Sequence, residues 1–525
     1  MARKVLVTEA LAPSGLELLQ RYAEVTVRLN PTREELLALV GDYDALVVRS
    51  ATRVTTEVLA AGTRLQVVGR AGTGVDNIDL EAATRRGIVV VNAPGGNTIA
   101  VAEHTLALML CMARHISRAD ASMHAGLWDK KALMGHELRG KTLGLVGLGR
   151  VGAAVASRAR SFEMHVLAYD PFVSLERAAQ LDVRMLPLDE LLAEADYISL
   201  HAPATERTRG MIGARELALV KPGARLINCA RGDLIVEEDL VDALKGGHLA
   251  GAALDVYADE PRVNPALRDC PGLLLTPHLG ASTEEAQAEA SLEVAEQVAD
   301  VLRGRPPRYP VNSVALSPEE LTFLQPYLDL AQCMGRLYAQ LAQNNLRHLQ
   351  ISFAGEVLEH DTTVLTAAAL AGLLSVATAE PVNRVNAPLL ARERGLTVQE
   401  VRTTEAQDWA GLITLRAQTT AGEHVLSGTV MRGRPHVVRI EDYWLDVVPE
   451  GLLLVSEHIE QPGVLGRMGT LLGDAGINIS FLQVGRRERG GVGLMVLGVD
   501  DVLPDAVLRQ VLDMPSVRSA RLVRL

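Results

Sequence analysis

Short apolar runs alternate with amphipathic segments along the first hundred residues, and the same pattern then restarts. The first series predicts helices at 13–22 and 54–61 and strands at 5–8, 45–48, 65–69 and 88–92. A long apolar helix is expected from 99 to about 118, and the second series then predicts strands at 142–146, 165–169, 197–200, 224–228, 251–254 and 273–276. Because strands that alternate with helices favour parallel sheets, the two series predict two doubly wound α/β domains.

A proline-rich boundary follows the second series. A helix predicted over 284–303 runs into RPPRYP at 305–310, and proline cannot continue a helix. Ser317-Pro318-Glu319-Glu320 then predicts a new helix start, in which the serine and Glu320 form a capping box. Residues 311–450 mix helices with alternating strands, and no catalytic motif is recognised there. The apolar run at 362–379 is rich in small residues, which favours a packed helix over a membrane span.

The last part of the chain, residues 451–525, has a compact pattern of its own. It predicts helices at 464–475 and 504–512 and strands at 452–459, 478–485, 492–499 and 517–523. That βαββαβ order predicts an antiparallel sheet with two helices on one face. Small modules of this kind commonly bind ligands or dimerise, an inference that rests on fold analogy alone.

The composition narrows the possible partners. A net charge of −12 and an aromatic content of 3% argue against a nucleic-acid surface, which uses basic patches and stacking rings. The cysteines at 111, 229, 270 and 333 form no CxxC pair, so neither a disulfide framework nor a metal site is expected. The N-terminal MARKVLVTEA predicts a strand rather than a signal peptide, so we expect a cytoplasmic protein without a membrane anchor.

The strongest local signal is TLGLVGLGRVG at 142–152, where a strand runs into Gly147-x-Gly149-x-x-Gly152 and a helix follows. In such a turn the first glycine allows the tight bend, the second lets a pyrophosphate approach, and the third lets the helix pack on the strand. Asp170 ends the next strand about 20 residues on, where a carboxylate accepts ribose hydroxyls and repels a 2′-phosphate. NAD is therefore favoured over NADP; the alternative is a tight turn without a ligand.

Three further residues follow strand ends in the second series. Arg231 lies in NCARGD, Glu260 in DVYADEP and His278 in TPHLGAS. Ligands gather at the carboxyl ends of strands in such sheets, so all three are expected on one rim. Arginine can grip a carboxylate bidentately, histidine can take a hydroxyl proton, and a carboxylate beside the histidine would orient it. Each residue alone is commonly structural, but together they predict the oxidation of a hydroxy acid.

A second glycine cluster, GRAGTGVDN at 69–77, lacks the third glycine of the dinucleotide motif and predicts a loop of amides near a substrate, or a structural turn. Together with VVRSATRVT (47–55), NAPGGNT (92–98) and the motifs above, it resembles the D-2-hydroxyacid dehydrogenase family. VNAPLLARERGL (385–396) and the C-terminal βαββαβ unit extend the resemblance to the long form of the D-3-phosphoglycerate dehydrogenases, over essentially the whole chain.

The resemblance implies a discontinuous architecture. A flavodoxin-like substrate-binding domain (1–97 and 285–310) would hold an inserted Rossmann NAD domain (98–284). An α+β intervening domain of the allosteric substrate-binding type (311–450) and an ACT domain (451–525) would follow. At least a homodimer, with a homotetramer favoured, is implied as well.

The resemblance also implies roles for individual residues. Arg231, Glu260 and His278 would be catalytic, and the substrate's anionic groups would meet Arg49, Arg70 and the amides of Gly95, Gly96 and Asn97. Lys130 stands where one family member has an arginine that reaches across a dimer, and lysine loses the bidentate geometry. Contacts to NAD, besides the glycine turn and Asp170, would come from Thr73, Arg150, Val151, Ala202, Cys229, Asp255, His278, Gly280 and Ala281.

For the ACT unit the resemblance implies L-serine as a feedback inhibitor. His458 and Asn478 fall on serine-binding positions in HIEQPGVLGRMGTLLGDAGINI, whereas Glu460 replaces an Asn or Asp of relatives and is one methylene longer than Asp. The alternative is a dimerisation module that binds nothing.

The expected function is the NAD-dependent oxidation of D-3-phosphoglycerate to 3-phosphohydroxypyruvate, the entry to serine synthesis. Another 2-hydroxy acid, such as hydroxypyruvate or 2-hydroxyglutarate, is the nearest rival, because Arg49 and Arg70 would also suit a second carboxylate. A non-enzymatic NADH-sensing scaffold shares this core and the catalytic trio, but the intervening and ACT-like regions argue against it.

Overall fold

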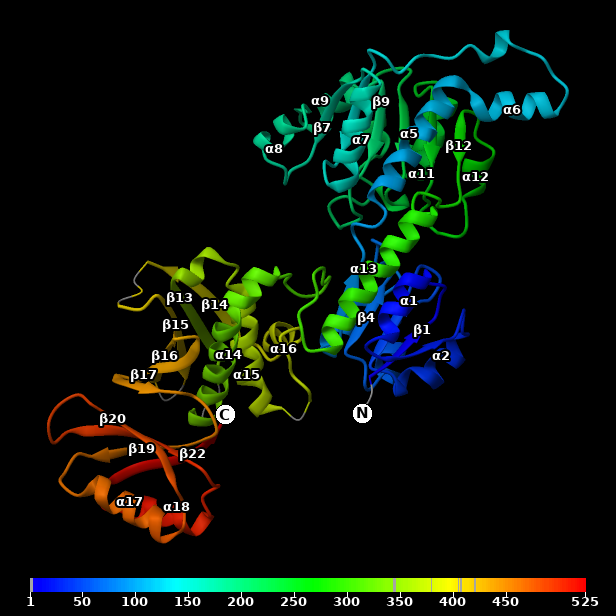
Figure 1. The fold of residues 1–525 in the computed structure, drawn as a ribbon. Coiled ribbons are helices and arrows are strands. Elements are labelled where there is room, and N and C mark those ends of the chain that lie inside the picture. Colours follow the sequence, from blue (N-terminus) through cyan, green and yellow to red (C-terminus); the bar gives the residue numbers. More distant parts are fainter. Residues whose placement is uncertain (1–2, 343–345, 379, 405, 407, 420–421) are drawn as a thin grey trace.

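Four β-sheets follow one another along the described part of the chain (Figure 1). The computed structural model describes residues 3–342, 346–378, 380–404, 406, 408–419 and 422–525. The two doubly wound domains, the α+β region and the antiparallel βαββαβ sheet that the sequence predicts are all present, so the predicted fold class is confirmed.

The first sheet is parallel, in the order β2-β1-β3-β4-β5. This is the flavodoxin-like order, whose carboxyl edge is the ligand edge. Its strands are β1 (Lys4–Val7), β2 (Glu24–Val27), β3 (Ala45–Val48), β4 (Val67–Arg70) and β5 (Val89–Asn92). Its helices are α1 (Pro13–Gln20), α2 (Arg33–Leu39), α3 (Thr56–Ala61) and α4 (Leu80–Arg85), joined by α13 (Glu284–Leu302), which packs on α1, β4 and β5. The chain therefore returns to this sheet after leaving it, as Figure 1 shows.

The second sheet is parallel, in the order β12-β11-β10-β9-β6-β7-β8, and the order reverses between β9 and β6, as in dinucleotide-binding folds. Its strands are β6 (Thr142–Val146), β7 (His165–Tyr169), β8 (Arg184–Met185), β9 (Tyr197–Leu200), β10 (Arg225–Asn228), β11 (Gly251–Leu254) and β12 (Leu273–Leu275). Its helices are α5 (Thr98–Arg114), α7 (Arg150–Ser161), α8 (Leu175–Gln180), α9 (Leu188–Glu194), α10 (Ala214–Leu219), α11 (Glu237–Lys245) and α12 (Pro265–Arg268).

The helix predicted from 99 to about 118 is confirmed up to Arg114, and its last four residues lie beyond a break. It ends at Arg114 because His115 adopts a left-handed backbone (φ 56°), and α6 (Ile116–His124) leaves at an angle of 63°. Apolar periodicity could not reveal this break, because one residue's backbone conformation makes it. Among the described residues no single helix is long and apolar enough to cross a membrane, although the bent α5–α6 pair meets that test by length and composition.

The third sheet begins after α14 (Pro318–Leu341), whose start has the predicted capping box between Ser317 and Glu320. Its order is β14-β13-β15-β16-β17-β18. The strands are β13 (His348–Gly355), β14 (Thr397–Thr403), β15 (Gly411–Thr419), β16 (Gly422–Met431), β17 (Arg434–Ile440) and β18 (Tyr443–Val447). The run at 362–379 is the helix α15 (Thr363–Ala377), buried against α14, with residue 379 outside the described part; α16 (Ala387–Glu393) follows.

The fourth sheet has the predicted βαββαβ order, with α17 (Val464–Asp474) and α18 (Asp505–Leu512) on one face. Its strands, β19 (Leu452–Ile459), β20 (Ile479–Arg486), β21 (Val492–Val499) and β22 (Val517–Arg524), pair antiparallel. On the other face Leu453, Val455 and Val496 join the core that surrounds α14. The ACT-like sheet therefore shares a hydrophobic core with the domain before it.

Candidate active site

The glycine turn after β6 has the geometry that its sequence predicts. Gly147 has a positive φ of 103°, and a Cβ on Gly152 would collide with the carbonyl of Gly147. A Cβ on Gly149 would meet nothing within 4 Å, so open space lies at the start of α7. The N-cap residue has no side-chain cap, and no acidic residue lies in the first turn of α7. These free amides and the helix dipole suit a pyrophosphate.

Asp170 lies at the end of β7 beside this turn. Its carboxylate accepts hydrogen bonds from the amides of Leu148 and Phe172, each at 2.9 Å. It therefore ties the glycine turn to the neighbouring strand and keeps lone pairs for further donors. A carboxylate at this point fits the ribose of NAD and disfavours the extra phosphate of NADP.

His278 and Glu260 form a hydrogen-bonded pair at the carboxyl edge of the second sheet. Nδ1 of His278 lies 2.7 Å from Oε2 of Glu260, whose Oε1 accepts from the amide of Tyr257. This pairing raises the pKa of His278 above its ordinary value, although burial and the charge of Arg231 oppose the shift. Burial would raise the pKa of Glu260, but the hydrogen bonds from His278 and Tyr257 outweigh it and lower that pKa. The pair therefore fixes the orientation of the imidazole through Nδ1, an arrangement that suits the predicted role of His278 as a base.

Asp255 holds the segment that carries His278. Its side chain is buried, and its oxygens accept from the Thr276 hydroxyl at 2.6 Å, the Leu279 amide at 2.7 Å and the Gly280 amide at 2.8 Å. His278 itself adopts a left-handed backbone with φ 56°. The predicted contact of Asp255 with NAD stays a prediction, whereas its contacts within the chain fix the segment that carries His278.

Three arginines converge where the two sheets face each other. Arg231 donates from Nε to Asp76 at 3.1 Å, and Arg70 is mostly buried. Burial and the charge of Arg231 lower the pKa of Arg70 to about 10, and Arg49 acts in the same direction while Asp76 and Glu9 oppose it. The Nε of Arg70 is buried without a hydrogen-bond partner. Three arginines near only two carboxylates, with one buried N–H that has no partner, suit an anionic ligand.

The glycine cluster at 69–77 makes room for these arginines. A Cβ on Gly72 would collide with Nη1 of Arg70, and one on Gly74 would collide with Nη2 of Arg231. The loop therefore packs against two guanidinium groups, in addition to presenting backbone amides. Its sequence did not reveal this packing role.

Replacing Gly74 by Ala is expected to displace Arg231, because its guanidinium end can move while the backbone stays. We expect kcat/KM to fall by about 10-fold or more, the cost of losing one charged hydrogen bond. The melting temperature should change little, since only the end of a flexible side chain must give way. Steady-state kinetics and thermal unfolding check this; an unchanged kcat/KM would show that Arg231 is not held by this loop.

The loop before α5 holds most of the other predicted substrate residues. Thr73 donates to the Asn97 side chain at 2.8 Å, and the amide of Gly95 lies 3.2 Å from Oε2 of Glu293 on α13. Burial raises the pKa of Glu293. The amide of Gly95 that the prediction assigns to a substrate carboxylate is therefore bonded to a carboxylate of the chain itself. Gly96 packs closely on α13, where a Cβ would meet the backbone of Ala290.

Two groups of predicted cofactor residues lie around the glycine turn and the strand ends. Arg150 opens α7, and its guanidinium stacks 5.2 Å from the centre of the Tyr309 ring. The backbone of Ala202 follows β9 beside Gly147. Cys229 is buried after β10, and burial raises the pKa of its thiol to about 12. Val151 lies in the first turn of α7, and Ala281 follows Gly280; the contacts of all these residues with NAD remain predictions.

Lys130 is not brought to this site within one chain. It is exposed in the segment between α6 and β6 that extends away from the second sheet (Figure 1). Sequence reasoning missed Asp76, Glu9, Glu293 and His104, which contact the site from its edges. Their signal is spatial, because each touches a predicted residue far away in the chain.

His104, Cys229 and Asp255 bring nitrogen, sulfur and oxygen atoms within 4.8 Å of one another. The oxygens of Asp255 are already used by two amides and a hydroxyl, and burial keeps Cys229 as a thiol. A metal needs a thiolate and free carboxylate lone pairs, so this cluster fits a hydrogen-bond network better than a metal centre.

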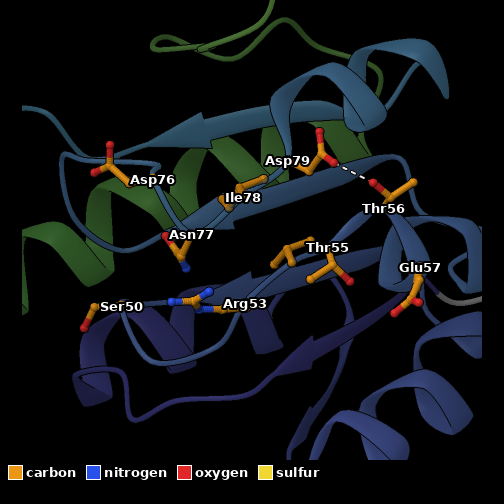
Figure 2. Close-up of a pocket in the computed structure, with 10 residues that line it drawn as sticks. Ser50, Arg53, Thr55, Thr56, Glu57, Asp76, Asn77, Ile78 and Asp79 are labelled. Carbon is orange, nitrogen blue, oxygen red and sulfur yellow. Dashed lines mark hydrogen bonds between the residues drawn. The ribbon is translucent and has the colours of Figure 1, made fainter. Parts of the chain in front are cut away.

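A groove of about 630 Å³ lies beside the substrate end of the site. Figure 2 shows Asp76 and Asn77 along one wall and Ser50 and Arg53 along the other. Asn77 donates to the carbonyls of Arg49 and Thr52, so it fixes the loop that carries Arg49. Since Asp76 also binds Arg231, this groove adjoins the arginine cluster.

The three predicted effector residues are divided between the two ends of the fourth sheet. His458 is 2% exposed and its Nδ1 has no hydrogen-bond partner, and burial lowers its pKa. The Glu460 carboxylate accepts hydrogen bonds from the Arg486 guanidinium at 2.5 Å and from the Gly490 amide at 2.8 Å. His458 pairs with Gly493, whereas Asn478 precedes the pair Ile479–Val499 and donates to Asp500. Gly493 and Val499 are six residues apart on β21, so at about 3.3 Å per residue roughly 20 Å separates His458 from the start of β20, where Asn478 lies. One chain therefore does not bring the three predicted effector residues together.

Known proteins resemble both halves of this structure. A family model for the D-isomer specific 2-hydroxyacid dehydrogenase, NAD binding domain matches residues 106–280. Models for the D-3-phosphoglycerate dehydrogenase intervening domain and the ACT domain match residues 323–441 and 453–515. The D-3-phosphoglycerate dehydrogenase of Synechocystis is 44% identical over 99% of this chain and 95% of its own, and that of Methanocaldococcus jannaschii is 41% identical over 99% and 100%.

This chain belongs to the D-3-phosphoglycerate dehydrogenase family. A crystal structure of the TT0316 protein from Thermus thermophilus matches 59% of this chain and 99% of its own, with a TM-score of 0.55 and 39% identity. Membership confirms the predicted resemblance, and the chain is an NAD-dependent 2-hydroxyacid dehydrogenase.

In such an enzyme the Glu260–His278 pair should determine how kcat/KM depends on pH. A base must be neutral, so kcat/KM should rise with pH through the pKa of His278. Replacing Glu260 by Gln removes the group that raises this pKa most, so the acidic limb of the profile should move to lower pH. Asp255 and Arg231, the other charges that act on His278, stay in place. A limb that stays fixed in pH–rate profiles of the variant would contradict the pairing.

Proposed function

We propose that this enzyme oxidises D-3-phosphoglycerate to 3-phosphohydroxypyruvate and is inhibited by L-serine. The observation that carries the substrate is the arginine cluster beside the His278–Glu260 pair. Arg70 is partly buried, its buried Nε has no hydrogen-bond partner, and its pKa is lowered by burial and by the neighbouring charge of Arg231. A hydroxy acid with two anionic groups would relieve this repulsion. The relatives named above are D-3-phosphoglycerate dehydrogenases, which supports phosphate as the second group.

The proposed mechanism gives each residue one task. Arg231 holds the substrate carboxylate and polarises the C2 oxygen, while Arg49 and Arg70 hold the phosphate. His278 takes the proton of the C2 hydroxyl on Nε2, and Glu260 keeps the imidazole oriented through Nδ1. A bound NAD would supply the acceptor for the hydride that leaves C2. The open turn at Gly149, the free start of α7 and Asp170 are the groups that would hold it.

The test follows NADH absorbance with purified protein, NAD and D-3-phosphoglycerate, with and without L-serine. Turnover that serine suppresses supports both parts of the proposal. Turnover without inhibition keeps the substrate and removes serine as effector. If hydroxypyruvate is reduced with NADH, or 2-hydroxyglutarate is oxidised with NAD, while phosphoglycerate and NAD give no turnover, the rival substrate replaces the proposed one.

A serine site would need two copies of the chain. Because Asn478 lies far from His458 and Glu460 in one chain, we propose that a second ACT-like sheet supplies it. This makes serine inhibition depend on assembly.

Assembly has a candidate surface in the segment between α5 and β6. Trp128 is 83% exposed and Met134 77%, and Ile116, Met123 and Leu127 are also exposed on this projecting arm (Figure 1). Large apolar side chains gathered on one extension are typical of a protein interface. We propose that the arm packs on a second subunit in a homodimer or homotetramer, which would also carry Lys130 toward the partner's substrate.

Replacing Trp128 by Asp is therefore expected to shift the protein toward monomer. The matched control is Phe172→Asp, because Phe172 is equally exposed, at 90%, but lies outside the arm. Light scattering after size exclusion measures both. A Trp128→Asp protein with the mass of the wild type would exclude the arm as the main interface.

The domain division predicted from the sequence is part of the same proposal, with the substrate domain closed by α13. A cytoplasmic location is proposed as well. It is supported by the cysteines at 111, 229, 270 and 333, which are all unpaired, as thiols are in a reducing compartment.

A further inference from the structure

A histidine outside the catalytic trio contacts the support of the base. His104 lies on α5, and its Nε2 is 3.3 Å from the Thr276 hydroxyl and 3.3 Å from Oδ1 of Asp255. Neither family resemblance nor the sequence pattern assigns it a role. The side chain is only 19% exposed, so it belongs to the interior network and not to the surface.

The proton on His104 can be assigned from its neighbours. The Thr276 hydroxyl uses its single hydrogen toward Asp255 at 2.6 Å, so toward His104 it can only accept. The Asp255 carboxylate also only accepts. Nε2 must therefore carry a hydrogen, shared between Thr276 and Asp255. His104 is thus a donor that completes the set of donors around Asp255.

Two of the donors around Asp255 belong to the backbone next to His278, the proposed base. Asp255 binds the amides of Leu279 and Gly280, the two residues that follow His278. His278 lies in the left-handed region, which costs free energy unless the surrounding structure holds it. Hydrogen bonds therefore connect His104 on α5 through Asp255 to the backbone segment that orients the His278 imidazole.

We propose that His104 is a positioning residue, which orients Asp255 and through it the segment of His278. The inference rests on the proposed role of His278 as the base. It also has a structural consequence, because Asn97 of the predicted substrate loop is the N-cap residue directly before α5. One helix thus joins the loop that meets the substrate to the carboxylate that supports the base.

The test compares His104→Phe, which keeps volume and removes the donor, with His104→Gln, which keeps an amide donor at similar reach. Cys111→Ala on the same helix is the matched control. We expect His104→Phe to lower kcat by about 10–100-fold, the effect of one lost hydrogen bond to a charged group. The Kd for NADH, from quenching of protein fluorescence, should stay within about threefold. His104→Gln should recover most of kcat, and Cys111→Ala should match the wild type.

Each other outcome would overturn the proposal. A His104→Phe enzyme with wild-type kcat removes the positioning role. Equal loss in the Gln and Phe variants, with a lowered melting temperature in both, means that His104 only fills space. Assays use whichever 2-hydroxy acid the wild type oxidises, so a wrong substrate proposal leaves this test intact. A His278→Asn variant with wild-type kcat would instead refute the base on which the inference rests.

Discussion

Replacing His278 by Asn should lower kcat by about 10²–10⁴-fold, the usual contribution of a positioned general base. Asn keeps a polar group near Nδ1 and also tolerates the left-handed backbone of this position, so the segment is expected to keep its conformation. It has no atom that can take the C2 hydroxyl proton. The loss should therefore appear in kcat, while the Kd for NAD changes little.

The measurement is steady-state kinetics over pH, with thermal unfolding as the control for folding. In the variant the acidic limb assigned to His278 should disappear from the profile, leaving a low rate that is nearly independent of pH. A variant that retains both the limb and a kcat within about tenfold of the wild type would transfer the role of base to another residue.

The parallel sheets were predictable because buried parallel strands are short apolar runs, such as 45–48 and 142–146, which match β3 and β6 closely. β2 and β8 were missed because they lie at sheet edges, where one side is solvated and the apolar signal is weak. The break at His115 was missed because a single left-handed residue makes it. Periodicity records which faces are buried, and it does not record one residue's φ.

The residues of the candidate site also fall into those that the sequence could predict and those that it could not. Residues at strand ends were predictable, because the topology of a parallel sheet alone brings Arg231, Glu260 and His278 to one rim. Asp76 and His104 were not, because they act across the two sheets or from a helix face, and their partners lie 155 and 172 residues away. The effector residues show the limit of motif reasoning: one motif contains His458 and Asn478, but β19 and β20 hold them apart.

Replacing Arg231 by Gln tests the second proposed role, which is to bind the substrate carboxylate and polarise the C2 oxygen. Losing the bidentate contact with the substrate carboxylate would remove two hydrogen bonds between charged groups, each worth about 1.5–3 kcal/mol, so kcat/KM should fall by roughly 10²–10⁴-fold. Folding should not suffer, because the charge of Arg231 acts against that of Arg70, and its removal lets the pKa of Arg70 rise toward the ordinary value. Arg209→Gln is the matched control, since Arg209 forms an exposed ion pair with Asp233 at 3.3 Å on the loop that follows Arg231.

Two substrates separate the roles of the arginines. D-Glycerate has the carboxylate and the C2 hydroxyl of phosphoglycerate but lacks its phosphate. If Arg231 grips the carboxylate, the Arg231→Gln variant should lose similar factors of kcat/KM with both substrates. An Arg70→Met variant should lose activity mainly with phosphoglycerate, because a phosphate-binding cation gains nothing from glycerate. The reverse pattern would exchange the two assignments and place the carboxylate at the buried end of the arginine cluster, where Arg70 has its unpartnered Nε.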